Sequence, residues 1–306
     1  MSTSRTVRFG LSLAVVAALG LSACGSDSLS KSSSSGSSSP AASVAVDPAL
    51  AAKLPAKIKS AGKVVVGTDA TYQPNEYLDT NGKTVIGMDV DLFNAVMAKF
   101  GVKTEWVPSD FSAIILGVTS GKYDVGVSSF TINKDRLGQA TMVSYFTAGT
   151  QFVVAKSNPK KVDQTMPCGL NIAVQKGTVQ ADDQLPALSK KCTDGGKPAI
   201  NPLVDADQAK VTSMIQSGKA DAMMVDLPPA ISAVENSSGA LELLGHQTDS
   251  APYGYVLPKD QADFGQAIVD ALKALDKDGT YKQILTKWKT QDGAITDFTV
   301  NPKVTG

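Results

Sequence analysis

The stretch TSGKYDVGVSS (residues 119–129) has a counterpart in QSGKADAMMVD (residues 216–226). Both contain Ser-Gly-Lys-x-Asp, and both stand between a helical pattern and a short apolar strand pattern. In each copy the fifth residue after the aspartate is polar, Ser129 in the first and Asp226 in the second. A common helix-to-strand turn would explain the glycines but not the polar strand ends. Ligands of open α/β sheets collect at such strand ends, so these two are candidate binding positions.

The same alternation of strands and helices extends through most of the chain. Apolar strand patterns lie at 63–70, 103–107, 123–128, 151–156, 171–175 and 222–225. Helical periodicity covers 88–100, 111–119, 209–217 and most of 262–290. This alternation predicts an α/β fold with mainly parallel sheets.

Composition indicates a globular protein and argues against nucleic-acid binding. The chain has 306 residues, 42% hydrophobic and 19% charged, which is enough for a sizeable core in one or two domains. Lys and Arg together number 29, as do Asp and Glu. Since no basic excess is available to meet phosphates, we expect no nucleic-acid partner.

The N-terminus is typical of an export signal. Arg5 and Arg8 precede the apolar run FGLSLAVVAALGL, which is shorter than the ~20 residues that a spanning helix needs. The run ends in LSAC (residues 21–24), which resembles the lipobox of bacterial lipoproteins. An ordinary signal peptide with an incidental cysteine is the alternative. We expect a lipoprotein signal peptide at 1–23 and a lipid anchor on Cys24 that holds the protein outside the cytoplasm.

A serine-rich segment follows the signal. Serine supplies 11 of the 19 residues from 25 to 43, and such a tract cannot bury enough apolar surface to fold. We therefore expect a flexible tether over 24–55, with the folded part beginning near Leu54 or Ile58.

Two further cysteines, Cys168 and Cys192, belong to a chain that the signal assigns to an oxidising compartment. We predict a disulfide between them, which closes a loop of 24 positions and is worth ~3 kcal/mol in the chain-entropy model. A zinc site is the alternative, but two cysteines with the single His246 would bind zinc weakly. We expect no metal and no cofactor.

Seven segments, in order, resemble the extracytoplasmic solute-binding proteins of polar-amino-acid ABC importers (solute-binding protein family 3). They are GTDATYQPNEY, GMDVDLFNAVMAKFG, SGKYDVGVSSFTINKDR, AVQKGT, SGKADAMMVD, PYGYVLPK and DGTYKQILTKW, spread over roughly residues 60–290. The resemblance implies a two-lobed periplasmic-binding-protein fold (type II) with the ligand in the cleft between lobes. Lobe 1 would comprise 56–152 and 253–306, and lobe 2 would comprise 153–252. The two crossings between the lobes are expected at 151–156 and 253–258.

The resemblance also implies a cradle for the carboxylate of an α-amino acid. Arg136 presents a planar fork of donors that matches a carboxylate bidentately. Ser129 and Thr131 would complete the cradle, together with Thr178 and the backbone around it, where the start of a helix favours an anion. A solvated surface charge is the plain alternative for Arg136.

On the other lobe, the resemblance assigns the ligand's α-ammonium to Asp226, assisted by Ser128. Taken alone, Asp226 could equally cap the helix that follows it, and Ser128 could satisfy backbone groups in a turn. Taken together, in order and on corresponding strand ends, these residues favour the binding site.

The walls of the cleft should set the choice of ligand side chain. Tyr72 keeps the aromatic that stacks over the ligand in the family, and Phe111 and Phe130 would add apolar surface. Asn75 stands where the family usually has an aromatic, and Val179 where a hydroxyl residue is common. These departures leave the ligand's side chain open.

The function that the resemblance implies is binding of a small polar amino acid and delivery to an ABC permease by hinge closure. Asp69 and Glu76 suggest a ligand whose side chain carries amide or cationic groups. We expect a monomer that is not an enzyme. One alternative is a dehydratase on the same fold, with Glu76 as general acid; another is a sensor or adhesin that has lost uptake.

Overall fold

This computed structural model describes residues 44–304 of the chain. One mixed sheet of eight strands forms the centre of this part. Its strands are β1 (Lys63–Thr68), β5 (Lys103–Pro108), β6 (Val125–Thr131), β7 (Thr141–Ala155), β8 (Asn171–Gln175), β9 (Asn201–Asp205), β10 (Ala222–Asp226) and β11 (Leu241–Leu257). Their order across the sheet is β5-β1-β6-β11-β7-β10-β8-β9. The α/β class predicted from the alternation of strands and helices is confirmed.

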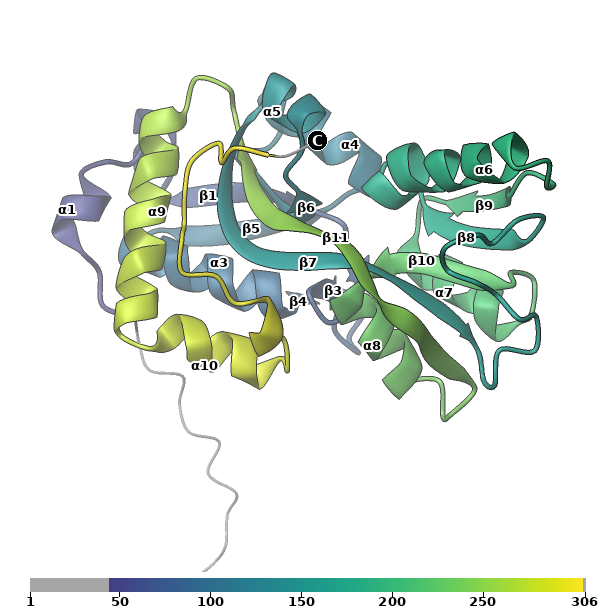
Figure 1. Ribbon diagram of the computed structural model, residues 1–306. Helices are drawn as coiled ribbons and strands as arrows, with labels where there is room; N and C mark the ends of the chain where they lie inside the picture. The colour runs from purple at the N-terminus through teal and green to yellow at the C-terminus, as the bar shows by residue number, and fades with distance from the viewer. Residues whose placement is uncertain (1–43, 305–306) are drawn as a thin grey trace, which may run out of the picture. The chain divides into compact units, whose positions relative to one another are not determined.

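The sheet is parallel toward its two edges and antiparallel in its middle. β5, β1 and β6 pair in parallel, as do β9, β8 and β10. β7 and β11 run antiparallel to each other and to the strands beside them, and Figure 1 shows them passing together from one parallel group to the other. The prediction of mainly parallel sheets is wrong for this middle part, because only short crossings were expected at 151–156 and 253–258.

Helices cover each parallel group, and we call the two assemblies lobe 1 (β1, β5, β6) and lobe 2 (β8, β9, β10). The helices of lobe 1 are α2 (Ala56–Ala61), α3 (Met88–Lys99), α4 (Phe111–Thr119), α5 (Lys134–Gln139), α9 (Ala262–Lys277) and α10 (Thr280–Lys287). Those of lobe 2 are η1 (Gln180–Gln184), α6 (Leu185–Asp194), α7 (Gln208–Gln216) and α8 (Leu227–Glu235) (Figure 1). A small second sheet of β2 (Thr71–Tyr72), β3 (Glu76–Leu78) and β4 (Val85–Ile86) follows β1 in lobe 1.

The aspartates of the two Ser-Gly-Lys-x-Asp motifs make equivalent hydrogen bonds to a neighbouring strand in the two lobes. Asp124 exchanges two hydrogen bonds with Val65 on β1, through its backbone N–H and through its carboxylate, each at 2.9 Å. Asp221 makes the same pair of bonds to Asn171 at the start of β8, at 2.8 and 2.9 Å. Each aspartate therefore fixes where the strand after it begins, and so where that strand ends.

The expected tether differs from the structure at its C-terminal end. Residues 1–43, with the predicted signal peptide and Cys24, lie outside the described residues. Within 44–55, helix α1 (Pro48–Ala51) begins at Asp47, whose carboxylate accepts the N–H of Ala49 at 2.8 Å. Leu50 and Leu54 are buried in the core of lobe 1. Burial of these two leucines stabilises a segment that the tether prediction had left unfolded.

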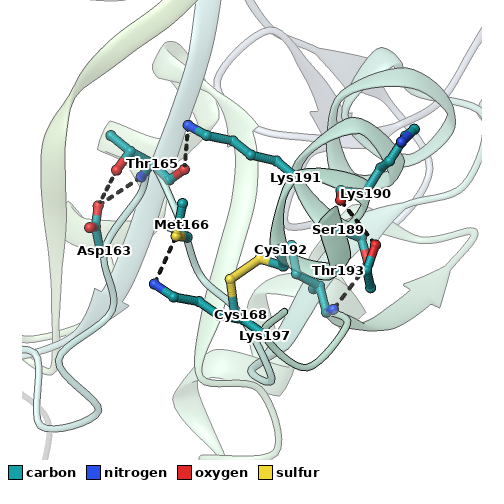
Figure 2. Close-up of a disulfide and its surroundings, with 11 residues drawn as sticks. Asp163, Thr165, Met166, Cys168, Ser189, Lys190, Lys191, Cys192, Thr193 and Lys197 are labelled. Carbon is teal, nitrogen blue, oxygen red and sulfur yellow. Dashed lines mark hydrogen bonds between the residues drawn. A yellow bond between two sulfur atoms is a disulfide. The ribbon is translucent and has the colours of Figure 1, made fainter. Parts of the chain in front are cut away.

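The predicted disulfide is present between Cys168 and Cys192, with the two Cα atoms 5.5 Å apart (Figure 2). It joins the segment before β8 to α6 on the outer part of lobe 2. Lys191 reaches across the same junction and donates to the carbonyl oxygen of Thr165 at 3.3 Å. Both links fasten α6 to the loop that leads into β8.

Candidate functional site

A small cavity of about 10 Å³ lies between lobe 1 and lobe 2, at the carboxyl ends of β6, β8 and β10. It is lined by Asp69, Tyr72, Phe111, Ser128, Ser129, Thr131, Arg136, Gln175, Thr178, Val179, Gln180 and Asp226. Apart from Asn75, Glu76 and Phe130, every residue predicted for the ligand site lies on this wall. The cavity is lined by charged and hydrogen-bonding groups, with Tyr72 and Phe111 as its aromatic surfaces.

Arg136 is buried, with 7% of its surface exposed, so the alternative of a solvated surface charge is wrong. Its guanidinium donates to the carbonyl oxygens of Thr131 at 2.7 Å and Gly177 at 3.0 Å. It also lies over the rings of Phe111 and Phe130, which stack on each other. Burial lowers the pKa of Arg136 to about 10, which still leaves the group charged at neutral pH.

Asp226, on lobe 2, is a buried carboxylate held by three donors. It accepts hydrogen bonds from the hydroxyls of Tyr72 at 3.0 Å and Tyr253 at 2.6 Å, and from the side-chain amide of Gln180 at 2.7 Å. Its side chain makes no capping bond to α8, so the helix-cap alternative is not observed. Burial raises the pKa of Asp226, while these donors and the Arg136 charge act in the opposite direction.

Asp69 supplies a second carboxylate to the cavity, from the loop after β1. It accepts from the hydroxyl of Thr71 at 2.7 Å and from the side-chain amide of Gln175, on lobe 2, at 2.5 Å. Burial raises the pKa of Asp69 to about 6, so it is mostly ionised at neutral pH. A buried carboxylate with acceptor capacity to spare suits a ligand group that donates hydrogen bonds and carries positive charge.

Ser128 and Ser129 are held from behind by side chains that do not reach the cavity. Ser128 donates to Glu76 at 3.0 Å, and Ser129 accepts from the side-chain amide of Asn75 at 2.8 Å. Asn75 and Glu76 are fully buried. The structure therefore places Asn75 and Glu76 beneath the site and Phe130 under Arg136. Glu76 has no access to a ligand, so the arrangement does not favour Glu76 as a general acid.

Thr178 lies on the cavity wall, but its polar groups are engaged within lobe 2. Its hydroxyl and its N–H both donate to the carbonyl oxygen of Gln175, at 2.7 and 3.4 Å. Gly177, just before it, adopts a left-handed φ of 80°, and a Cβ there would lie 2.8 Å from a Ser112 side-chain carbon. Glycine thus allows lobe 2 to approach lobe 1 closely beside Arg136.

Sequence reasoning missed two residues that line the cavity, Gln175 and Gln180, and two that hold lining residues in place, Tyr253 and Asp89. Gln175 stands at the carboxyl end of β8, so the strand-end rule that selected Ser129 could have found it. Tyr253 falls in a segment read only as a crossing, and Asp89 in a helix start whose acidic residues are common. Neither carried a signal of its own.

The hydrogen bonds that join the two lobes at the cavity include those from Tyr72 to Asp226, from Gln175 to Asp69, and from Arg136 to the carbonyl of Gly177. A cavity of about 10 Å³ has room for roughly one water molecule and not for an amino acid. A ligand of that size therefore requires the lobes to separate and some of these bonds to be exchanged.

Over residues 44–304, no group of three or more His, Cys, Asp or Glu side chains is placed to hold a metal ion. The helices described in the same range include none long and apolar enough to cross a membrane.

The chain is similar to known amino-acid-binding proteins over most of its length. It is 29% identical over 254 residues to the arginine-binding protein ArgT of Corynebacterium glutamicum, which covers 83% of each chain. Among solved structures it is similar to an ancestral arginine-binding protein bound to arginine, at 31% identity and a TM-score of 0.68, covering 74% of this chain and 98% of that one. It is also similar to AncCDT-1, an ancestral amino acid-binding protein described as a precursor of cyclohexadienyl dehydratase, at 29% identity and a TM-score of 0.64, covering 76% and 97%.

The family model of the bacterial extracellular solute-binding proteins, family 3, matches residues 64–291. Because this match spans most of the chain, and because fold and cavity agree with it, the chain belongs to the bacterial extracellular solute-binding proteins, family 3.

Proposed function

We propose that this protein binds an α-amino acid with a cationic side chain, with arginine as the leading candidate, and delivers it to an ABC permease. The observation that carries the proposal is the pair of opposite charges on facing lobes. Arg136 on lobe 1 offers a donor fork for the α-carboxylate, and Asp226 on lobe 2 offers an acceptor for the α-ammonium. Only a ligand with both groups satisfies both lobes together.

Asp69 supports the cationic side chain. It is a buried carboxylate on the same cavity, and its charge is balanced by hydrogen bonds rather than by an ion pair among the described residues. A guanidinium or ammonium would supply that missing charge and would lower the raised pKa of Asp69. The names of the relatives ArgT and the ancestral arginine-binding protein point to the same class of ligand.

Closure of the lobes follows from where the partners lie. β7 and β11 connect the two lobes, and the ligand's ends are bound from opposite sides. A ligand that contacts both lobes has higher affinity for the closed arrangement, so it shifts the population toward closure. The closed, loaded protein would then be the form that the permease accepts, with lipidation of Cys24 holding it at the membrane.

Isothermal titration of the purified protein against the common amino acids tests the proposal. The protein is first unfolded and refolded, so that ligand carried through purification is removed. We expect arginine or another cationic amino acid to bind with a Kd in the micromolar range or below, and neutral amino acids to bind at least ~10-fold more weakly. Equal affinity for neutral and cationic amino acids would contradict the role of Asp69. No binding across the panel would contradict the proposed function.

A further inference from the structure

Two carboxyl groups lie fully buried behind the serines of the cavity wall. Glu76 on β3 and Asp89 on α3 are both inaccessible to solvent. The Ser129 hydroxyl is 3.4 Å from Glu76 Oε2 and 3.2 Å from Asp89 Oδ2, so the two carboxyl groups are neighbours. Neither takes part in any of the ion pairs formed within residues 44–304. The ligand contacts proposed above use neither group.

The hydrogen bonds around Glu76 and Asp89 indicate that the pair holds one proton. The two carboxyl groups flank one serine hydroxyl, whose single hydrogen can serve only one of them, and Asp89 Oδ1 is a buried atom with no hydrogen-bond partner among the described residues. Two ionised carboxylates would have no further hydrogen to place between them. Burial raises the pKa of Asp89 to about 6, while the Tyr145 hydroxyl at 2.5 Å and the Ser129 N–H at 3.0 Å, both bound to its Oδ2, favour its ionised form. Burial and the Asp89 charge hold the pKa of Glu76 well above its usual range. Because the donors gather on Asp89, the shared proton is better placed on Glu76 and the charge on Asp89.

This arrangement fixes the direction in which the Ser128 hydroxyl can bond. Ser128 donates its single hydrogen to Glu76 Oε1 at 3.0 Å and accepts the Asp69 N–H at 3.0 Å. A serine hydroxyl has one donor and two acceptor lone pairs, so one lone pair remains. Since Ser128 lines the cavity, what it offers a ligand is an acceptor.

The same pair holds the backbone at Ser129. This residue has a φ of 50°, a left-handed conformation that is uncommon for residues other than glycine. Its N–H donates to Asp89, and its hydroxyl accepts from Asn75 and has one hydrogen to give to either carboxyl group. The backbone near the end of β6 is thus stabilised from behind, and the residues that follow β6 lead to Arg136.

We propose that Glu76 and Asp89 are positioning residues that share one proton, fix Ser128 as a hydrogen-bond acceptor toward the cleft, and thereby favour a ligand group that can only donate, such as an ammonium. The inference rests on the proposed function, since it concerns the α-ammonium of that ligand. A carboxyl pair with no shared proton would leave like charges together in the interior, where nothing described compensates them.

A carbon-13 NMR titration of the carboxyl groups in the ligand-free protein tests the shared proton without any ligand. Groups that face the pair from other elements are Asp69, Tyr72, Tyr145 and Tyr255. Burial raises the pKa of all three tyrosines, so Asp69 is the neighbour that titrates below neutral pH. We expect Glu76 to be protonated and Asp89 ionised at pH 7. Two ionised carboxylates at pH 7 would overturn the proposal.

Two substitutions at Glu76 test the positioning role by titration with arginine. Glu76→Gln places an amide where the protonated carboxyl stood, so it can still accept from Ser128 and donate to Asp89. We expect this variant to bind within about threefold of the wild type. Glu76→Met keeps similar length but offers no partner to Ser128, whose hydroxyl is then free to turn its hydrogen toward the ammonium. We expect at least a ~10-fold loss of affinity.

The Ser128→Ala background shows whether the effect passes through Ser128. There, Glu76→Met should cost less than about threefold, because the hydroxyl it misorients is absent. Wild-type affinity in Glu76→Met would overturn the proposal. So would a ~10-fold loss in Glu76→Gln, even if Glu76→Met fails to fold. A wild type that binds no amino acid contradicts the proposed function instead, and the NMR titration still decides whether the proton is shared.

Discussion

At the residue scale, the site is built by burying charge next to donors that belong to the protein. Arg136, Asp226 and Asp69 are each nearly inaccessible, and each keeps hydrogen-bond partners of its own. Burying a charge without partners costs several kcal/mol, so these bonds are what allows the groups to remain ionised in the closed cleft. A ligand gains affinity by replacing neutral partners with charged ones.

Arg136 is the residue whose loss should be felt most. Arg136→Ala removes the donor fork, and we expect the affinity for the amino-acid ligand to fall by at least ~10-fold, the lower end for a charge-assisted bond. Arg136→Lys should recover only part of this, because an ammonium lacks the planar fork. Lys134→Ala is the matched control, an exposed cation on the same helix α5. Equal affinity of Arg136→Ala and Lys134→Ala by calorimetry would remove Arg136 from the site.

Asp69 should make stability depend on pH. Its folded pKa, about 6, lies above the ordinary value of 3.8, so the folded state binds this proton more tightly. The resulting stabilisation is present below pH ~4 and is lost as the pH rises through about 6; it amounts to at most about 3 kcal/mol. We expect urea unfolding of ligand-free Asp69→Asn to show a smaller loss of stability between pH 4 and pH 7 than the wild type. An identical loss in both proteins would assign the effect to other groups, such as Asp89.

Sequence reasoning found most of the side chains that line the cavity, but it placed Asn75 and Glu76 among them rather than behind the serines, and it missed Asp89. Ser128, Ser129, Arg136 and Asp226 stand at strand ends or in motifs, where chemistry leaves a visible pattern. The bonds from Gln175 to Asp69 and from Ser128 to Glu76 join residues 106 and 52 positions apart. No local pattern encodes such pairs, because they exist only once the two lobes and the small sheet have been assembled.

At the element scale, Asp124 and Asp221 of the repeated motif connect neighbouring strands by hydrogen bonds. We expect Asp124→Ala and Asp221→Ala each to lower the free energy of unfolding by about 1–3 kcal/mol, because each leaves a strand N–H without its partner. Their salt-bridge partners, Lys57 and Lys160, have side chains that are 70% and 62% exposed. Lys57→Ala and Lys160→Ala are therefore matched controls that should cost less than ~1 kcal/mol. Equal losses of unfolding free energy for the aspartate and lysine variants in urea would contradict this role of the two aspartates.

The disulfide is a second link between elements, and both of its cysteines belong to lobe 2. Cys168→Ser with Cys192→Ser should lower the free energy of unfolding by ~3 kcal/mol, mainly by freeing the unfolded chain. Cys192 is also completely buried, so its serine leaves a polar group in the core. Reduction of the wild-type disulfide separates the two effects. An unchanged melting temperature after reduction would contradict the predicted stabilisation.

Elements with a strong periodic pattern could be predicted, and those without one could not. The helix expected over 111–119 begins and ends where predicted, as α4 (Phe111–Thr119). The length of β7 and β11 was missed. β7 is buried along almost its whole length, so no alternation marks it as a strand, and β11 changes from mostly exposed to buried as it passes from one lobe to the other. The outer part of β11 is exposed between Gly245 and Ser250, where no alternation of apolar residues marks a strand.

At the scale of the whole molecule, the function proposed above depends on a balance between open and closed arrangements of the two lobes. In this structure the lobes are joined by bonds from Tyr72 to Asp226 and from Gln175 to Asp69, both between groups that the proposed ligand would use. The ligand would replace these bonds with its own contacts. Its contribution to the free energy of closure is therefore the difference between its contacts and the bonds it replaces.

Small-angle X-ray scattering with and without arginine measures that balance. We expect arginine to reduce the radius of gyration of the wild type, because a ligand bound to Arg136 and Asp226 joins the two lobes. Arg136→Ala should show no such change at the same ligand concentration. Gln175→Ala removes one bond between the lobes without removing a charge, so the ligand-free protein should be more open and the change on binding larger. No change in the wild type, with binding established by calorimetry, would mean that the closed arrangement already dominates without ligand. Hinge closure driven by the amino acid would then be wrong.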